Sequence, residues 1–345
     1  MKKILVFAGM LILVNLSFAQ DIHFSQFYET QLYLNPSSSG VFNGDQRVIA
    51  NYRNQWPSIS GIYKTYLLSF DTKLFQKRKL SNNYMGLGLV VFNDQSDGAR
   101  LSTLQANISL SYHVLINEQN YLSAGIQGGY AQRSINNSAL QWDNQYDGDD
   151  YNQSLASGEP SIMFSNFSYG DFGAGVLWNY FSKDKNVFSN NVGFGANIGA
   201  SVFHINRPEQ SFYGNKDKLN PKLVIYGETS FGTRDANMSL LPAATFITQG
   251  PLTEVVFGSK IRYMTEGSRY TSFIKQSALS LGAYCRLKDA FIFAIEYEYS
   301  YFALGISYDL NISNLTEVTE GKGGMEISLR FINPNPMKRS IRFYR

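Results

Sequence analysis

Apolar and polar residues alternate strictly over several stretches of the chain. From residue 104 to residue 114 every second side chain is apolar, and every side chain between them is Gln, Asn, Ser or His. The same alternation returns over residues 192–202, where Gly, Asn and Ser fill the polar positions, and over residues 325–331. A period of two over about ten residues predicts β-strands whose two faces meet different environments.

Segments of this kind recur between residues 47 and 332, separated by turn-rich stretches. We count about fourteen or fifteen of them and predict fourteen, because single-chain outer-membrane barrels have an even number of strands. The candidate centres lie near residues 50, 68, 88, 109, 125, 164, 176, 197, 227, 244, 258, 282, 294, 304 and 328.

Two architectures contain alternating strands. A soluble β-sandwich uses strands of about 5 or 6 residues, whereas several of these segments reach ten or more, the length that a tilted strand needs to cross a bilayer. Because a sheet edge in lipid has no hydrogen-bond partner, a spanning sheet must close on itself. The sequence therefore predicts an all-β protein, a transmembrane antiparallel β-barrel of about fourteen strands over residues 47–332.

The N-terminus has the pattern of a secretory signal peptide. Two lysines precede an apolar stretch over residues 4–14, and Ser17-Phe18-Ala19 matches a small-x-small cleavage site. We predict that residues 1–19 are removed and that the mature chain begins at Gln20. A membrane anchor, the alternative, needs about 20 apolar residues, and Asn15 interrupts this stretch.

Composition agrees with a surface that faces lipid. Charged residues make up 17% of the chain, below the value of about 25% for soluble domains, while Tyr (23) and Phe (25) are abundant. Loss of Lys2 and Lys3 with the signal peptide lowers the formal net charge from +3 to +1, so we expect no nucleic-acid partner. The predicted location is the outer membrane, in contact with its lipid.

Residues suited to catalysis or metal binding are few. His23, His113 and His204 lack a second His or Cys at metal-ligand spacing. The single cysteine, Cys285, has no nucleophile context and no disulfide partner. We expect no enzymatic activity and no cofactor, and we place His113 at the end of a lumen face.

An acidic stretch over residues 143–150 matches part of an EF-hand loop. Asp143, Asp147 and Gly148 are in place, but Gln145 and Ser154 occupy positions that need stronger oxygen ligands. An EF-hand is therefore not predicted. A weak cation site and a solvated acidic loop both stay open.

Distinctive sequence blocks occur along the whole mature chain: HFSQFYETQLYLNPSSSG (residues 23–40), NYRNQWP (51–57), LSFD (68–71), LQWDNQYD (140–147), SGE (157–159), KLNPKL (218–223), LGAYCRLKDA (281–290), ALGISYDLNISNL (303–315) and GGMEISLRF (323–331). In this order they resemble the PorP/SprF family of Bacteroidetes outer-membrane proteins, which is associated with type IX secretion and gliding motility. Two departures are visible: Ile22 stands where the family often has Pro, and Ser37 where it has Ala.

The resemblance implies a non-enzymatic role in protein secretion. Members assist export or surface anchoring of adhesin-type substrates, with the outward loops holding the substrate's C-terminal region. The inner face would contact the secretion and gliding machinery, including periplasmic peptidoglycan-associated lipoproteins. The alternative is a FadL-like or porin-like channel for small solutes, which requires an open lumen.

Residues 20–46 precede the first strand and are rich in aromatic and amide side chains. A barrel of about fourteen strands encloses more space than its own side chains fill. We therefore expect this segment to plug the lumen or to cap the barrel on the periplasmic side, lying on inward glycines such as Gly125, Gly129, Gly193, Gly195 and Gly199. The candidate plug or partner-binding residues are His23, Phe24, Ser25, Gln26, Phe27, Tyr28, Tyr33, Leu34, Asn35, Pro36, Arg53 and Trp56.

Two segments at the barrel margins have open roles. Trp56, just before Pro57, either lies at the membrane interface or contributes to a binding surface. The tail over residues 333–345 has four basic residues among its last eight. It is either solvated or docks a periplasmic partner.

Overall fold

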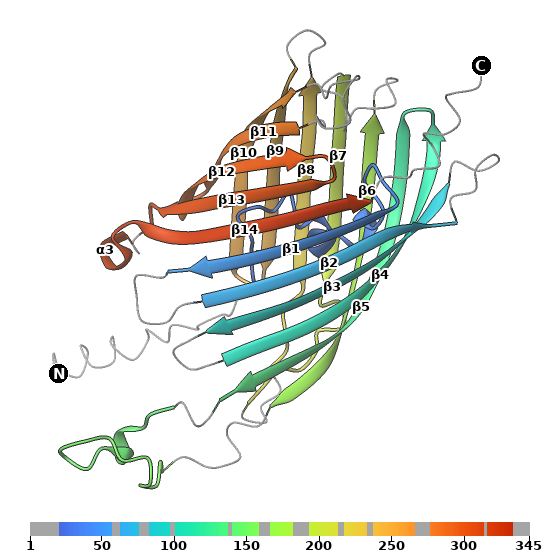
Figure 1. The fold of residues 1–345 in the computed structure, drawn as a ribbon. Coiled ribbons are helices and arrows are strands. Elements are labelled where there is room, and N and C mark those ends of the chain that lie inside the picture. Colours follow the sequence, from blue (N-terminus) through green and yellow to red (C-terminus); the bar gives the residue numbers. More distant parts are fainter. Residues whose placement is uncertain are drawn as a thin grey trace, which may run out of the picture.

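The computed structural model describes residues 21–56, 63–75, 83–96, 101–136, 140–158, 166–181, 193–212, 217–232, 237–265, 277–313 and 316–333. In this part the chain forms fourteen strands that close into one antiparallel barrel (Figure 1). The strands are β1 (Gln46–Gln55), β2 (Tyr63–Leu74), β3 (Tyr84–Ser96), β4 (Leu101–Asn117), β5 (Asn120–Ile135), β6 (Phe167–Phe181), β7 (Gly193–Phe203), β8 (Lys222–Gly232), β9 (Met238–Gln249), β10 (Leu252–Thr265), β11 (Ser277–Arg286), β12 (Ala290–Tyr299), β13 (Phe302–Asn311) and β14 (Lys322–Asn333).

Each strand pairs with its neighbours in chain order, and β1 closes the barrel against β14. The closing pair extends from Gln46 opposite Asn333 to Gln55 opposite Gly324, so all of β1 is paired on both sides. The predicted class and the predicted number of strands are both confirmed. The fifteenth candidate centre, near residue 164, lies outside the described residues, as do the signal peptide, Pro57 and the tail beyond Asn333.

The barrel is apolar on the outside and polar on the inside. On β4, Ile108 is 60% exposed while the neighbouring Ser109 is fully buried, and the same alternation covers residues 104–114. A soluble protein shows the opposite arrangement, because its apolar side chains avoid water. Apolar residues facing outward on long tilted strands are typical of a barrel embedded in lipid.

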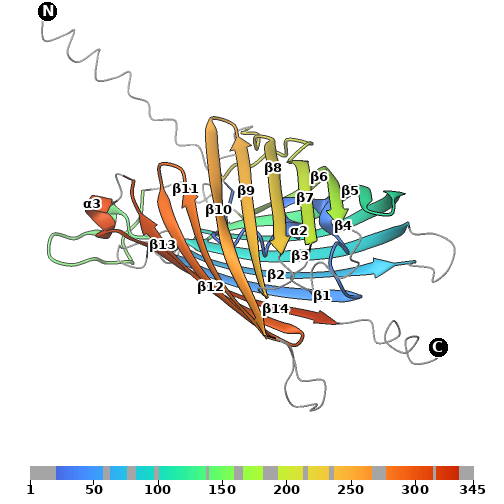
Figure 2. The same cartoon turned by 90° about the horizontal axis from the view of Figure 1, so that it is seen from above.

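The apolar core lies inside the barrel and is built around residues 21–45, which we call the N-terminal segment (Figure 2). This segment contains a short helix, α2 (Gln31–Leu34), and a 3-10 turn, η1 (Pro36–Ser38). Asn35 separates them: its side chain accepts the backbone N–H of Ser37 at 2.9 Å and caps the turn. The core also includes inward side chains of the strands, among them Leu67, Phe92, Leu177, Val224, Tyr226, Tyr284 and Ile292.

One other short helix, α3 (Thr316–Thr319), lies in the connection between β13 and β14. Among the described residues, no helix combines the length and the apolar character needed to cross a membrane.

Candidate functional site

The N-terminal segment extends along the inside of the barrel from one end to the other. At one end the carboxylate of Asp21 lies 2.7 Å from Nε2 of His204 and 2.9 Å from Nζ of Lys222. At the other end the backbone N–H of Asp45 donates to the carbonyl of Asn333 at 3.0 Å, next to the start of β1.

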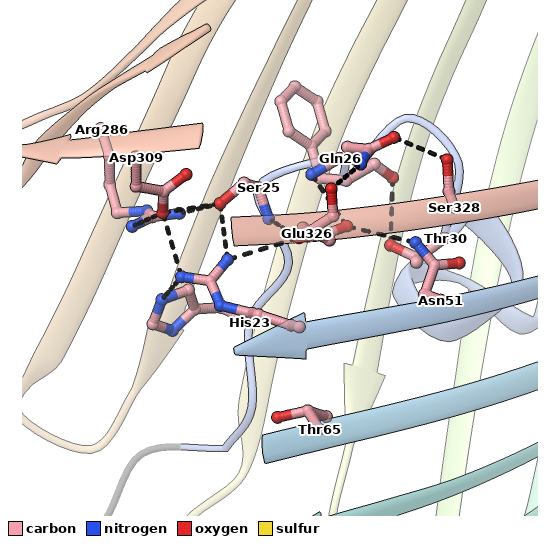
Figure 3. Close-up of polar contacts among 12 residues, drawn as sticks. His23, Ser25, Gln26, Thr30, Asn51, Thr65, Arg286, Asp309, Glu326 and Ser328 are labelled. Carbon is pink, nitrogen blue, oxygen red and sulfur yellow. Dashed lines mark hydrogen bonds and ion pairs between the residues drawn. The ribbon is translucent and has the colours of Figure 1, made fainter. Parts of the chain in front are cut away.

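Ser25 lies at the centre of a buried group of charges, shown in Figure 3. Its backbone N–H donates to Glu326 at 2.7 Å, and its hydroxyl donates to Asp309 at 2.7 Å. Arg53 and Arg286 each donate to the same hydroxyl and form ion pairs with Asp309 at 3.1 and 3.2 Å. We call Ser25, Arg53, Arg286, Asp309 and Glu326 the Ser25 cluster.

Charge pairing holds this cluster together. The two guanidinium groups pair with Asp309 and Glu326. Arg286 also pairs with Asp289 at 3.0 Å and lies 4.0 Å from Glu254 at the margin of the cluster. A buried charge is tolerated only when it is paired and hydrogen bonded, so each member requires the others. His23 completes the group, since Arg53 lies 3.2 Å from its Nε2.

Two more polar side chains bind the segment to β14. The side-chain amide of Gln26 donates to the carbonyl of Glu326 at 3.1 Å and accepts from Ser328 at 2.7 Å. Glu29 accepts two hydrogen bonds from Arg330, at 2.7 and 2.9 Å. These pairs fix the position of the segment along β14.

Glycines on the inward faces make room for the segment. A Cβ at Gly125 would lie 2.5 Å from the backbone nitrogen of Ser37, and one at Gly199 would lie 2.7 Å from the amide nitrogen of Asn35. Both contacts are closer than a side chain permits, so glycine is required there while the segment stays in place. Similar collisions with the segment would occur at Gly86, Gly88, Gly175 and Gly305.

Three other glycines named from the sequence are placed differently. A Cβ at Gly129 would meet the side chain of Asn107 rather than the segment. Gly193 and Gly195 lie at the start of β7.

The end of the segment at Asp21 has a distinct electrostatic environment. Both ring nitrogens of His204 face carboxylates, Nε2 that of Asp21 and Nδ1 that of Asp171 at 2.8 Å. Burial alone would lower the pKa of His204, but the two carboxylates outweigh it and raise the pKa to about 9. For Asp21 burial alone would raise the pKa, but the positive charges of Lys222 and His204 hold that pKa well below its usual value. The contact is therefore an ion pair at neutral pH.

The structure brings eleven of the twelve candidate residues together inside the barrel. Arg53 and the nine candidate residues between Phe24 and Pro36 are buried, and His23 is partly buried beside Arg53. Trp56 lies apart, just after the end of β1, with its ring 5.6 Å from that of Tyr63.

Apart from Arg53, the strand residues that hydrogen bond to the segment were not identified from the sequence. Their one signal is a charged side chain at a polar position of an alternating strand, as at Glu326 between Met325 and Ile327. Such a charge needs a partner inside the barrel. The inward faces carry more charge than the sequence analysis anticipates, since Arg47, Arg53, Asp71, Asp171, Lys222, Arg286, Glu296, Asp309 and Glu326 are all buried.

His113 and the acidic stretch have structural partners. His113 is buried, and its Nε2 lies 2.8 Å from the carbonyl of Ser39. In the acidic stretch, Asp147 accepts the backbone N–H groups of Asp149 and Asp150 at 3.1 and 2.9 Å. Over the described ranges, no group of three or more His, Cys, Asp or Glu side chains is arranged to hold a metal ion.

Comparison with known protein families assigns the chain to one family. Residues 16–331 match the family described as Type IX secretion system membrane protein PorP/SprF. The chain belongs to this family. With its lipid-facing barrel, this PorP/SprF protein is an outer-membrane component of the type IX secretion system, and membership implies partners in that machinery. The description of the matched family is that of a secretion-system membrane protein and indicates no enzymatic family.

Solved structures share the barrel architecture with this PorP/SprF protein at low sequence identity. The toluene transporter TbuX of Ralstonia pickettii is 11% identical, with a TM-score of 0.45 over 88% of this chain and 94% of that chain. BamA from Haemophilus ducreyi, lacking POTRA domains 1–3, is 11% identical, with a TM-score of 0.39 over 84% and 71%. The KdgM porin is 7% identical, with a TM-score of 0.36 over 83% and 98%. No curated protein matches the chain.

Proposed function

We propose that this protein assists the export or surface anchoring of adhesin-type substrates of the type IX secretion system, without enzymatic activity. Its outward loops hold the C-terminal region of the substrate. Its inner face contacts the secretion and gliding machinery, including periplasmic peptidoglycan-associated lipoproteins. Family membership over residues 16–331 supports this role.

The observation that carries the proposal is the occupied interior of the barrel. Apolar side chains of the N-terminal segment, such as Phe27 and Leu32, are almost fully buried. Burial of each side chain of this size contributes about 1.5–3 kcal/mol. Together with the Ser25 cluster, these contacts support a segment that plugs the lumen, so the barrel works as a docking platform rather than a pore.

A channel for small solutes, FadL-like or porin-like, is the second candidate, and one feature favours it. Along the wall from β8 to β11, several inward polar atoms have no hydrogen-bond partner among the described residues, namely Glu228 Oε1, Ser230 Oγ, Thr245 Oγ1, Ser259 Oγ and the Tyr284 hydroxyl. Buried polar atoms of this kind are usually bound to water. A narrow wet path beside the segment would satisfy them.

Affinity purification of the tagged protein from gently solubilised outer membranes tests the first candidate. We expect mass spectrometry to identify a large secreted adhesin-type substrate or components of the secretion machinery. Conductance in planar bilayers tests the second candidate, and we expect the intact protein to be closed. Recovery of no partner together with an open conductance would contradict the secretion role.

A further inference from the structure

Different elements lie at the two ends of the barrel. In Figure 1 the arrowhead of β1 points toward the end where α3 and residues 140–158 (green) lie, which we call the loop end. The arrowhead of β14 points toward the opposite end, where β1 begins. We call this the terminal end.

Asp21 lies at the loop end. Its carboxylate contacts His204, which follows the last residue of β7, and Lys222, the first residue of β8. Its backbone N–H donates to Gln249, the last residue of β9, at 3.0 Å. Because strand direction alternates, β7 and β9 finish at the loop end, as β1 does, and β8 starts there.

From Asp21 to Gly40 the segment crosses from the loop end to the terminal end, with a turn at α2 from which Tyr33 reaches back to Lys222 at 3.1 Å. His23 contacts Arg53, close to the end of β1. Farther along, the side chain of Asn35 donates to the carbonyl of Val176, in the second half of β6, and Gly40 donates to Asp71, near the end of β2. The two ends of the segment therefore lie at opposite ends of the barrel, and β1 begins at the terminal end.

The lengths of the connections between strands indicate how the barrel is oriented in the membrane. The longest connections join strands at the loop end, over residues 136–166 and 204–221. At the terminal end the longest are residues 182–192 and 266–276. Outer-membrane barrels place longer loops outside the cell and shorter turns in the periplasm.

We infer that the mature N-terminus of this protein is threaded through its own barrel and lies at the cell surface. Asp21 would then be held beside the surface loops by His204 and Lys222, while the start of β1 and the end of β14 face the periplasm. This inference goes beyond the proposed function, since it holds for a docking platform and for a channel alike. It adds Asp21, with His204 and Lys222, to the surface that an extracellular partner meets.

Accessibility of an epitope in intact cells tests the threading. The epitope is inserted between Gln20 and Asp21, and matched chains carry it between Asp149 and Asp150 or after Arg345. We expect the first two chains to give the same antibody signal before and after permeabilisation of the outer membrane. The chain tagged after Arg345 should give no signal until the membrane is permeabilised. An N-terminal epitope that needs permeabilisation would overturn the inference.

A second measurement covers the case in which the inserted epitope prevents assembly. In a Cys285→Ser background, Asp21→Cys places a thiol at a side chain that is 23% exposed in the native protein. We expect a membrane-impermeant maleimide to label it in intact cells. A cysteine appended after Arg345 should be labelled only after permeabilisation, and equal behaviour of the two thiols would refute the threading.

Discussion

The N-terminal segment and the acidic loop of residues 140–158 were both candidate binding regions in the sequence. In the structure their hydrogen-bond partners differ: those of the segment are distant along the chain, and those of the loop are near. In the segment, Ser25 bonds to Glu326 and Asp309, about three hundred positions away along the chain. In the loop, Asp147 bonds to Asp149 and Asp150, its near neighbours. The segment is buried and the loop is exposed.

This difference shows what distinguishes a structural site from a local turn. Partners from distant strands fix the segment, because the barrel register brings their charges to one place. The loop satisfies its own backbone and depends on no other element for these hydrogen bonds. Changes to the segment should therefore affect the whole protein, and changes to the loop should stay local.

Removal of Glu326 should have the largest effect. In Glu326→Ala the backbone N–H groups of Ser25 and Gln26 lose their acceptor, and Arg53 loses a paired carboxylate. Loss of one partner from a buried charge group costs about 3–5 kcal/mol. Thermal and denaturant unfolding in detergent should detect this loss.

The matched control for Glu326 is Glu320→Ala, at an exposed side chain whose ion pair with Lys322 is also exposed. An exposed ion pair of this kind is screened by solvent and contributes little to stability. Equal unfolding midpoints for Glu326→Ala and Glu320→Ala would show that the Ser25 cluster does not stabilise the barrel.

Enlarging Gly125 should displace the segment. In Gly125→Ala the new methyl group overlaps the backbone of Ser37, and overpacking of this kind costs about 1–3 kcal/mol. The control is Gly128→Ala on the same strand, whose Cβ would be 3.5 Å from Phe172, an ordinary contact. Limited proteolysis should cut residues 24–40 faster in Gly125→Ala than in Gly128→Ala. The same rate in both variants would argue against a tight fit.

Alkaline pH should loosen the end of the segment at Asp21. The folded-state pKa of His204, about 9, lies above its ordinary value of 6.5, so its ion pairs stabilise the protein fully below pH 6.5. This contribution, on the order of 3 kcal/mol, is lost as the pH rises through 9. Hydrogen exchange at the backbone of residues 21–24 should therefore accelerate between pH 7 and pH 10.

The variant His204→Gln isolates the cause of this pH dependence. It removes the titrating ring, so exchange in this range should follow only the intrinsic chemical rate. If His204→Gln keeps the same extra acceleration as the native protein, then Lys222 or another group controls the release.

The barrel was predictable because successive side chains of each strand face two different environments, which requires apolar and polar residues to alternate. Lipid outside and polar groups inside force the alternation seen from Leu104 to Val114. The preference for even strand numbers decided between fourteen and fifteen. Burial of the apolar residues of the segment was also expected, since Phe24 and Phe27 suit neither water nor a solvated linker.

Most polar partners of the segment on the strands were not predictable, for a physical reason. Contacts such as Gln26 with Ser328 depend on the register of strands that close only at the end of the chain. A polar residue at an inward position looks the same in sequence whether it faces water or the segment. The direction of the segment through the barrel has no sequence signal either.

Disruption of the acidic loop should have the smallest effect. Asp147→Ala removes two hydrogen bonds within an exposed turn, and substitutions at such sites usually change stability very little. The unfolding midpoint should match that of the native protein, with and without added calcium. A midpoint that rises with calcium in the native protein, but not in Asp147→Ala, would show that the loop holds a cation. The loop would then resemble the segment in depending on a partner beyond its own backbone.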